Sequence, residues 1–579
     1  MSPRAAPAFN REAADFVWRA KYRRDGEEDV ADTWRRMARA VASVEADPET
    51  WAARFGEALD GFAFLPGGRI AAGAGADPEA VLFNCFVLPG PGADLGEALS
   101  ALGETVATLR AGGGVGIDLS AVPPRGTGRP ASPGPVAYLE LWDAASRSLL
   151  ADAPRRGAMM GALSCRHPDV AAFAEAKAAP GALSRFNLSI AISDDFMAAV
   201  RAGADWTLRF PAGEPWAGGV AGAEAGVVRA RDLWDRILRS AFETGEPGVL
   251  FVDRINRANA LGWRERIAVT NPCGEIPLPD YGACDLGSLN LPVFVRAPFA
   301  DEARLDLDAL ARAAATAVRF LDDVIDLSAY PLEPQRAAAL ASRRVGLGLT
   351  GLGDALVMLN LRYGEPASLS LAGEIMRTIR DAAYRASAAL AREKGPFPLF
   401  DAERYLGGEF AAALPPDIRR QIADHGLRNS HLLAIAPTGS ISLVAGAVST
   451  GLEPIYARTQ MRRILGRDGA PREFRLVDPA LALWRRTRGD TAGEPPAMVT
   501  AHELSIAAHL DMQAALQPFV DNAISKTVNV APDLPFAAFA DIYDQAFDRG
   551  LKGCTVFRSA GGPATPLGEC APEQGACAR

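Results

Sequence analysis

The sequence predicts an α/β protein that carries a small helical region at its N-terminal end. Between residues 61 and 558, short apolar segments of strand character alternate with longer segments of helical periodicity, an order typical of α/β proteins. The clearest examples are two strand-like segments, 187–192 and 432–436, and two helical segments, 305–325 and 370–393. Over residues 10–60, apolar residues recur at helical spacing among charges. We therefore expect a helical region over residues 1–60 and one large α/β unit over residues 61–558.

Composition and charge narrow the functional class. Of the 579 residues, 49% are hydrophobic and 23% are charged, as in ordinary globular proteins, and no apolar run is long enough to span a bilayer. The formal net charge of −9 gives no general affinity for nucleic acid. Residues 1–7 lack the apolar core of a secretion signal. These features indicate a cytoplasmic protein with neither a membrane nor a nucleic acid as partner.

The cysteines indicate catalytic or redox chemistry rather than structural bridges. The chain has seven, an odd number that does not suit a disulfide scaffold, and thiols in a cytoplasmic enzyme are more often catalytic or metal-binding. Two of them, Cys570 and Cys577, lie in residues 559–579, which are rich in Gly, Pro and Ala. That composition predicts a flexible C-terminal tail.

One short loop carries an amide, a thiol and a carboxylate at alternate positions, in Asn271, Cys273 and Glu275. Prolines within and after this set argue against a helix, and in an extended segment residues two apart face the same way. We therefore expect the three side chains to face one pocket. A further thiol, Cys284, follows eleven residues after Cys273. Taken alone, Cys273 is better explained as a structural thiol beside a turn, but the complete set favours a catalytic pocket.

This loop resembles the finger loop of ribonucleotide reductases, with its Asn-x-Cys-x-Glu core and trailing cysteine. Further segments resemble the same family, in the same order and over nearly the whole chain: 83–88, 112–117, 155–161, 167–169, 186–189, 436–442, 521–527 and 550–558. Each is a weak signal alone, whereas their common order is a strong one. The resemblance implies a ten-stranded α/β barrel of the type found in ribonucleotide reductases and glycyl-radical enzymes, with the 271–284 loop threaded through its centre.

The resemblance implies that the chain reduces ribonucleotides to 2′-deoxyribonucleotides, the precursors of DNA. Loss of the ribose 2′-hydroxyl becomes feasible once a radical stands at C3′, and a sulfur radical can take that hydrogen atom reversibly. The family pattern assigns the thiyl radical to Cys273. In the same pattern Glu275 is the general base that accepts the proton of the 3′-hydroxyl, and Asn271 binds the ribose hydroxyls.

Two further thiols supply the reducing equivalents, and the resemblance identifies them as Cys85 and Cys284. They are far apart in the sequence, so the fold must bring them within disulfide range. The tail thiols Cys570 and Cys577 would then reduce that disulfide by thiol–disulfide exchange and be reduced in turn by a thioredoxin-like protein. A chance occurrence of two cysteines in a disordered end is the alternative for the tail pair.

Residues 437–442 resemble the phosphate loop of the family. Consecutive backbone N–H groups and hydroxyls suit an anion, and a helix that began there would add to the affinity. Taken alone, a Thr-Gly-Ser segment is a common turn. The expected substrate-binding residues are Gly68, Asn84, Gly114, Pro437, Thr438, Gly439, Ser440 and Ile441. Diphosphates are favoured over triphosphates as substrates, and both stay open.

The source of the radical is inferred from motifs that the sequence lacks. Reductases that take the radical from a separate small subunit carry adjacent tyrosines in the stretch that corresponds to 552–558, and this chain has no Tyr-Tyr pair. The Arg-Val-x-Gly-Tyr-like segment of glycyl-radical reductases is also absent. The adenosylcobalamin-dependent class remains. No histidine stands in an Asp-x-His-x-x-Gly arrangement, so we expect adenosylcobalamin to bind without a histidine ligand and no metal to be held by protein side chains.

The resemblance also implies an effector, a deoxynucleotide or ATP, that binds at the interface of a homodimer, with Asp94 as a candidate contact. Two alternative functions are retained. One is the large subunit of a reductase that takes its radical from a small subunit, against which the missing tyrosine pair argues. The other is a non-catalytic nucleotide-binding regulator, which would not need the complete set of thiols, amide and carboxylate.

Overall fold

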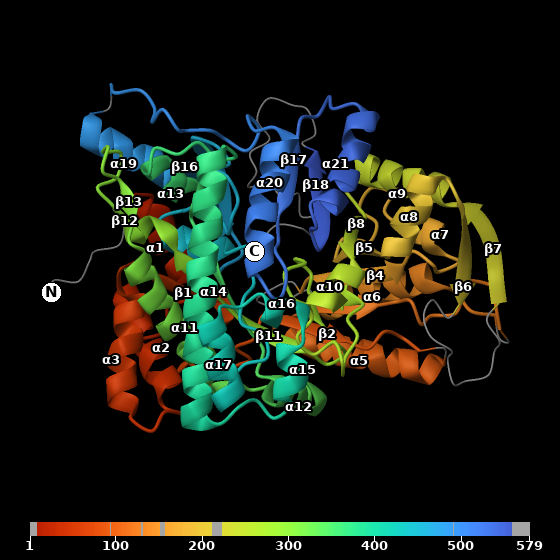
Figure 1. Ribbon diagram of the computed structural model, residues 1–579, viewed down its shortest axis with the longest axis horizontal. Helices are drawn as coiled ribbons and strands as arrows, with labels where there is room; N and C mark the ends of the chain where they lie inside the picture. Colours follow the sequence, from red (N-terminus) through yellow and green to blue (C-terminus); the bar gives the residue numbers. More distant parts are fainter. Residues whose placement is uncertain are drawn as a thin grey trace.

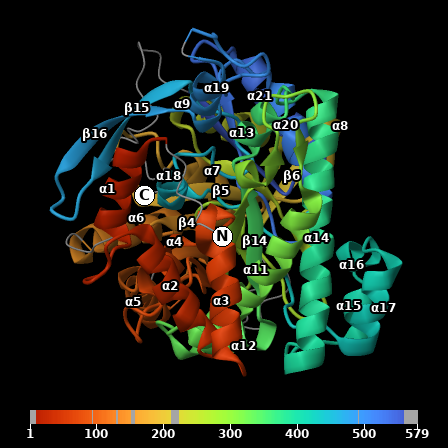
Figure 2. The ribbon, with the colours of Figure 1, turned by 90° about the vertical axis from the view of Figure 1, so that its left-hand side faces the viewer.

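The computed structural model describes residues 9–92, 94–128, 131–150, 157–210, 223–489 and 491–558 (Figure 1). Three helices form its N-terminal part: α1 (Arg11–Lys21), α2 (Val30–Ala42) and α3 (Pro48–Leu59). Helix α2 begins at a capping box made by Asp29 and Asp32, and Pro48 opens α3 directly after its cap, Asp47. The three helices lie at one end of the molecule, where α2 and α3 pack on α11 (Leu307–Leu327) (Figures 1 and 2).

Within the described ranges, ten strands form the central sheet, in the order β1-β11-β2-β3-β4-β5-β8-β18-β17, and β14 pairs with β11 off this path. The strands are β1 (Phe64–Pro66), β2 (Cys85–Leu88), β3 (Gly114–Asp118), β4 (Met159–Ser164), β5 (Phe186–Ile192), β8 (Gly248–Phe251), β11 (Ala283–Asn290), β14 (Val345–Thr350), β17 (Thr527–Val530) and β18 (Gly553–Arg558). Strands β2, β3, β4, β5 and β8 run parallel to one another. Their neighbours β11 and β18 are antiparallel to them, so the sheet combines groups of parallel strands that run in opposite directions.

The strand expected over 432–436 is present only as isolated bridges, one to β14 and one to the segment just before β17. The carboxylate of Asp521 accepts the main-chain N–H groups of Leu432 and Leu433, at 2.8 Å each, so these groups are not available to a regular ladder. The expectation of a regular strand here was therefore wrong. The cause is a side chain that lies far away in the sequence.

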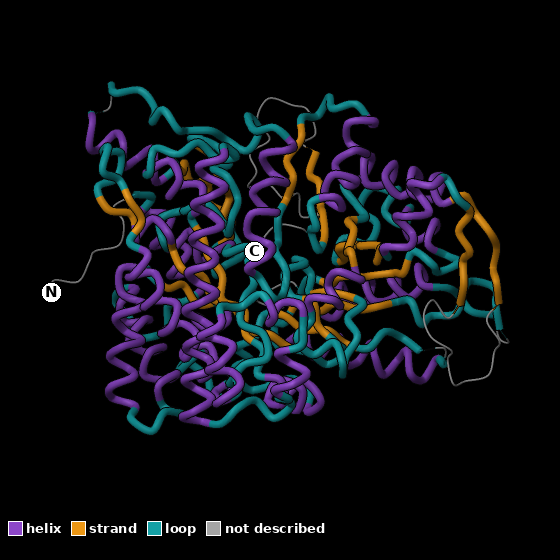
Figure 3. The backbone as a smooth tube through the Cα atoms, viewed as in Figure 1, coloured by secondary structure: helices purple, strands orange, loops and turns teal. Residues whose placement is uncertain are grey.

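Helices surround the strands (Figure 3). Besides those named above they are α4 (Gly68–Gly73), α5 (Leu95–Arg110), α6 (Pro135–Leu149), α7 (Val170–Ala174), α8 (Asp194–Ala202), α9 (Ala230–Thr244), α10 (Val252–Ala258), α12 (Glu333–Ser342), α13 (Leu352–Met358), α14 (Pro366–Lys394), α15 (Ala402–Leu406), α16 (Glu409–Ala412), α17 (Pro416–His425), α18 (Gly439–Val444), α19 (Pro479–Arg488), α20 (Ile506–Leu516) and α21 (Phe536–Asp548). The helices expected over 305–325 and 370–393 are confirmed as α11 and as part of α14, and the strand expected over 187–192 is confirmed as β5.

Among the residues that the structure describes, four two-stranded hairpins complete the fold. They are β6 (Asp205–Phe210) with β7 (Ala223–Arg229), β9 (Val269–Thr270) with β10 (Pro277–Leu278), β12 (Val295–Arg296) with β13 (Arg304–Leu305), and β15 (Thr459–Leu465) with β16 (Pro471–Val477). The β15–β16 hairpin projects from the body of the molecule beside α1 (Figure 2). Among the helices within the described ranges, none combines the length and the apolar character needed to cross a bilayer.

The apolar core is divided by the sheet. Two large clusters join one face of the strands to the surrounding helices. A third, smaller cluster joins the other face of β2, β4 and β11 to the β9–β10 hairpin and contains Cys85, Cys284, Ile276 and Leu286. Because side chains alternate along a strand, Ala283 of β11 belongs to the helix-facing cluster while its neighbour Cys284 belongs to the inner one. The loop that includes Cys273 therefore lies against the inner face of the sheet.

Candidate active site at the 269–278 hairpin

The 269–278 segment is a tight hairpin, and its tip, residues 271–276, is closed on itself. The Asn271 main-chain N–H donates to the Ile276 carbonyl at 3.0 Å, and the Ile276 N–H donates to the Asn271 side-chain oxygen at 2.9 Å. Gly274 takes a φ of +86°, which a side chain would disfavour. The expectation of an extended segment with alternating side chains was therefore wrong, because Gly274 and the Asn271 amide fold these residues into a turn.

The turn still brings the amide and the carboxylate to one thiol, which is Cys85 on β2. The Asn271 side-chain nitrogen lies 3.1 Å from Cys85 Sγ, and Cys85 Sγ lies 3.9 Å from Glu275 Oε1. The side chains of Asn271 and Glu275 are buried, whereas Cys273 between them is exposed. The amide, the carboxylate and Cys85 thus form a closed group, and Cys273 lies at its accessible side.

Cys85 and Cys284 face each other across two antiparallel strands. They are directly paired residues of β2 and β11, and both are buried, unbridged thiols. Directly opposed residues of an antiparallel pair have Cα atoms about 4.5–5.5 Å apart, which is within the range of a disulfide. The fold therefore brings together two thiols that the sequence separates by almost 200 residues.

Burial and mutual charge raise the pKa values throughout this group. Burial raises the pKa of Glu275 to about 7. Burial also raises the pKa of Cys85 well above its usual range, and the charges of Glu275, Cys284 and Cys273 add to that shift. The pKa of Cys273 is raised by burial and then by Glu275, although its side chain is exposed. Because its pKa is raised, the accessible Cys273 thiol keeps its hydrogen atom at neutral pH.

The glycines of β3 let that strand approach the hairpin closely. A Cβ on Gly116 would lie 2.0 Å from the Thr270 carbonyl oxygen, and a Cβ on Gly114 would lie 3.1 Å from the Pro272 ring. Gly114 is one of the expected substrate-binding residues, and in the structure it lies with Gly116 against the hairpin. Gly114 also donates its N–H to the Asn84 carbonyl at 2.8 Å, next to Cys85.

Buried oxygens around the hairpin tip lack hydrogen-bond donors among the described residues. They are Oδ1 of Asn84, Oδ1 of Asn187 and Oε2 of Glu275. Asn187, on β5, donates its side-chain nitrogen to the Pro272 carbonyl at 2.8 Å and so supports the tip. Sequence reasoning did not single out Asn187 as a site residue; its signals were its place in 186–189, a segment that resembles the family, and a polar side chain within an apolar run. Unpaired acceptors suit a ligand that brings hydroxyl groups.

The segment expected to bind phosphate begins the short helix α18, and part of it is already engaged. Thr438 donates its N–H to Thr450 Oγ1 at 2.7 Å, and its hydroxyl lies 2.9 Å from Thr350 Oγ1. The expectation of consecutive available N–H groups was therefore wrong at Thr438. Ser440 Oγ lies 2.6 Å from the hydroxyl of Tyr22, a residue of the N-terminal region. Pro437 and Ile441 flank these polar groups in the same turn.

The remaining predicted residues are spread more widely. Gly68 begins α4. The preceding Gly67 donates its N–H to the Leu286 carbonyl at 2.7 Å, and a Cβ added at Gly67 would meet the Asn84 side chain. Asp94 caps α5, where its carboxylate accepts the N–H groups of residues 96 and 97. Cys570 and Cys577 lie outside the described residues.

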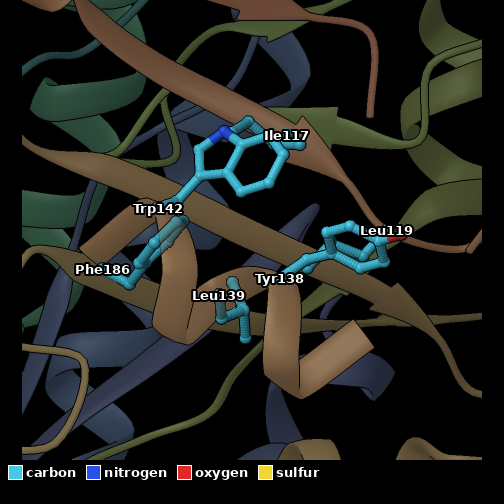
Figure 4. Close-up of a pocket in the computed structure, with 6 residues that line it drawn as sticks. All are labelled: Ile117, Leu119, Tyr138, Leu139, Trp142 and Phe186. Carbon is cyan, nitrogen blue, oxygen red and sulfur yellow. The ribbon is translucent and has the colours of Figure 1, made fainter. Parts of the chain in front are cut away.

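A hollow elsewhere in the molecule is not part of this group. It lies between α6 and strands β3 and β5 (Figure 4), and its lining is Ile117, Leu119, Tyr138, Leu139, Trp142 and Phe186. These side chains belong to the helix-facing core, on the opposite face of the sheet from Cys85 and Cys284. The hollow offers neither thiols nor carboxylates.

Comparison with known families agrees with the geometry. The model of the ribonucleotide reductase barrel domain matches residues 83–557, and the model of the ribonucleotide reductase all-alpha domain matches residues 9–78. The chain belongs to the ribonucleotide reductase family. The expected architecture is thus confirmed at the level of a reductase barrel domain preceded by an all-alpha domain, with a ten-stranded sheet.

Two similar reductases carry names that state a vitamin B12 dependence. The chain is 38% identical to the vitamin B12-dependent ribonucleoside-diphosphate reductase of Mycobacterium tuberculosis, over 94% of this chain and 78% of the relative. It is 32% identical to the protein of the same name from Thermoplasma acidophilum, over 87% of this chain and 65% of the relative. The ribonucleoside-diphosphate reductase subunit alpha of Synechocystis is 31% identical over 72% of this chain and 59% of its own length.

Proposed function

We propose that this reductase converts ribonucleoside diphosphates to 2′-deoxyribonucleoside diphosphates by thiyl-radical chemistry that adenosylcobalamin starts. The observation that carries the chemistry is the group of Asn271, Glu275 and Cys85, with Cys284 opposite Cys85 and the accessible thiol of Cys273 beside them. The cofactor and the diphosphate substrate are those named for the relatives from Mycobacterium tuberculosis and Thermoplasma acidophilum.

The accessible thiol of Cys273 fits such a cofactor. Bound adenosylcobalamin supplies one-electron chemistry able to remove the hydrogen atom of a thiol, and Cys273 is the exposed thiol among the described cysteines. Within the described ranges, no group of three His, Cys, Asp or Glu side chains is arranged to hold a metal ion. The buried histidines His167, His431 and His509 are each hydrogen-bonded within the fold.

The first chemical step belongs to Cys273 and Glu275. The Cys273 sulfur radical takes the hydrogen atom from C3′ of the ribose and becomes a thiol again. Glu275 accepts the proton of the 3′-hydroxyl, and its pKa of about 7 suits a general base at neutral pH. The unpaired oxygens of Asn84, Asn187 and Glu275 are acceptors for the ribose hydroxyls that this step must hold in place.

Reduction then consumes the pair of thiols on β2 and β11. Cys85 and Cys284 supply two hydrogen atoms in total, the 2′-hydroxyl leaves as water, and one S–S bond forms between the two sulfurs. The Asn271 amide, which donates a hydrogen bond to the Cys85 sulfur, holds that thiol beside the ribose. Cys570 and Cys577 reduce the S–S bond by thiol–disulfide exchange, and a thioredoxin-like protein reduces them in turn.

The proposal also covers the architecture of the chain. The two isolated bridges beyond β14 support a closed barrel of ten strands with the 271–284 loop at its centre. The division into a helical region over 1–60, a catalytic barrel over 61–558 and a tail over 559–579 remains part of the proposal.

Exposed leucines support a homodimer. Leu95 and Leu99 of α5 are 66% and 54% exposed, and Leu141 and Leu149 of α6 are also exposed. Apolar side chains on two neighbouring helices suit a second copy of the chain. The effector, a deoxynucleotide or ATP, would bind at that interface near Asp94.

The decisive experiment uses the purified chain alone. We expect it to form deoxynucleoside diphosphates from the four ribonucleoside diphosphates when adenosylcobalamin and dithiothreitol are added, and to form none without the cofactor. Cys273→Ser serves as the control, because an alcohol O–H bond is too strong for this hydrogen transfer. Turnover that requires a metal-containing second protein would instead identify the chain as a large subunit. Binding of nucleotides with no turnover under either condition would identify a regulator.

A further inference from the structure

The N-terminal helical region touches the phosphate loop through one buried side chain. Tyr22 follows α1 directly, is only 1% exposed, and places its hydroxyl 2.6 Å from Ser440 Oγ. The two residues are 418 positions apart in the sequence. Helix α1 packs along α18, the helix that the phosphate loop begins.

A second contact fixes the same region at the far end of α18. The Asn10 side-chain nitrogen donates to the carbonyls of Gly446 and Val477, at 2.9 and 2.8 Å. The Asn10 side-chain oxygen accepts the Val477 N–H at 3.0 Å. Tyr22 and Asn10 thus hold α18 near both of its ends, and the position of the Tyr22 hydroxyl relative to the loop is set by more than one bond.

The acidity of the two hydroxyls gives the Tyr22–Ser440 bond a direction. Either hydroxyl can donate in this geometry, and we assign the donor role to Tyr22 because a phenol is a stronger acid than an alkanol. The Ser440 proton then remains for another acceptor. The other loop hydroxyls are engaged, since Thr438 bonds Thr350 and Ser442 donates to the Gly439 carbonyl at 2.7 Å. Phosphate oxygens only accept hydrogen bonds and would take the Ser440 proton.

We propose that Tyr22 is a positioning residue for the phosphate end of the substrate: its hydroxyl aims the Ser440 hydroxyl at a phosphate oxygen. The inference rests on the proposed function, because it takes a nucleoside diphosphate as the ligand of the loop. It gives the helical region a part in substrate binding. Donation by Tyr22 also polarises the Ser440 hydroxyl and strengthens its own bond to the anion.

The test is a double-mutant cycle on the full chain with cytidine diphosphate, followed by equilibrium dialysis without cofactor. Tyr22→Phe keeps the buried ring and removes only the hydroxyl. We expect it to weaken binding about fivefold, the effect of one hydrogen bond of about 1 kcal/mol. Ser440→Ala should weaken binding at least as much, and the double variant should bind no more weakly than Ser440→Ala. In turnover assays Tyr22→Phe should raise KM by the same factor and leave kcat unchanged.

Tyr405→Phe is the matched control, because it also removes a buried phenol hydroxyl, one that donates to the Ser430 carbonyl at 3.0 Å. It should leave the affinity for cytidine diphosphate unchanged. Wild-type affinity in Tyr22→Phe, or losses that simply add in the double variant, would overturn this inference while the proposed function stands. If the unmodified chain does not bind cytidine diphosphate at all, the proposed function fails and the inference fails with it.

Discussion

The contact between β3 and the hairpin can be tested by adding one methyl group at Gly116. The Cβ of Gly116→Ala would lie 2.0 Å from the Thr270 carbonyl oxygen, so the hairpin must move by more than roughly 1 Å to restore a van der Waals contact. The Thr270 carbonyl is backbone and cannot rotate away. Overpacking of this kind costs about 1–3 kcal/mol of unfolding free energy. A displacement of about 1 Å at reacting groups costs about 100-fold in rate.

We therefore expect Gly116→Ala to lower kcat for deoxynucleotide formation by about 100-fold and to reduce the denaturant midpoint measurably. Gly56→Ala is the control, because a Cβ at this helical position in α3 meets nothing within 4 Å. That change should stabilise the chain by about 0.5–1 kcal/mol and leave kcat unchanged. A Gly116→Ala variant with wild-type kcat and stability would refute the idea that β3 fixes the position of Cys273 and Glu275.

Further predictions concern individual side chains. For Glu275, kcat/KM of the wild type should fall as the pH drops below about 7, because the protonated carboxyl cannot accept a proton, and Glu275→Gln should be slower and lack this limb. The folded chain also keeps the Glu275 proton up to about pH 7, whereas the unfolded chain releases it near pH 4.3. As the pH rises from about 4.3 to 7, the stability of the wild type should therefore decline relative to that of Glu275→Gln, which thermal unfolding measures. Asn187→Ala should raise KM and lower kcat together, since it frees the Pro272 carbonyl at the hairpin tip; an unchanged rate would exclude that support. Cys570→Ser or Cys577→Ser should block turnover with a thioredoxin-type reductant but preserve one turnover of the pre-reduced chain, and loss of that first turnover would give the tail another role.

The candidate site residues could be named from the sequence because they stand in a short motif that resembles the reductase finger loop. Asn271 and Glu275 were found as a pair at fixed spacing, and both reach Cys85 in the structure. Cys284 could be expected near Cys85 because two thiols that form a disulfide must meet. The periodicity of long helices such as α11 was also sufficient to find them, because one face of each packs on the core.

Contacts between distant segments left no local pattern and were not predicted. The turn at 271–276 depends on a positive φ at Gly274, which the sequence permits but does not require. The broken strand at 432–436 results from capture of its N–H groups by Asp521. The contact between Tyr22 and Ser440 joins two residues that only the folded chain brings together. At 432–436 a side chain from a distant segment overrides the local preference of the backbone.

The most direct test of the account separates Cys273 from Cys85 in one assay. Each thiol is replaced by serine, and the variant is incubated with adenosylcobalamin and a 3′-tritiated ribonucleoside diphosphate while tritium release and free base are followed. Cys273→Ser should give neither, because no radical reaches C3′. Cys85→Ser should still lose the 3′ hydrogen and then release base, because the intermediate cannot be reduced. Base release by Cys273→Ser together with a silent Cys85→Ser would contradict the assignment of Cys273 as the thiol that starts the reaction.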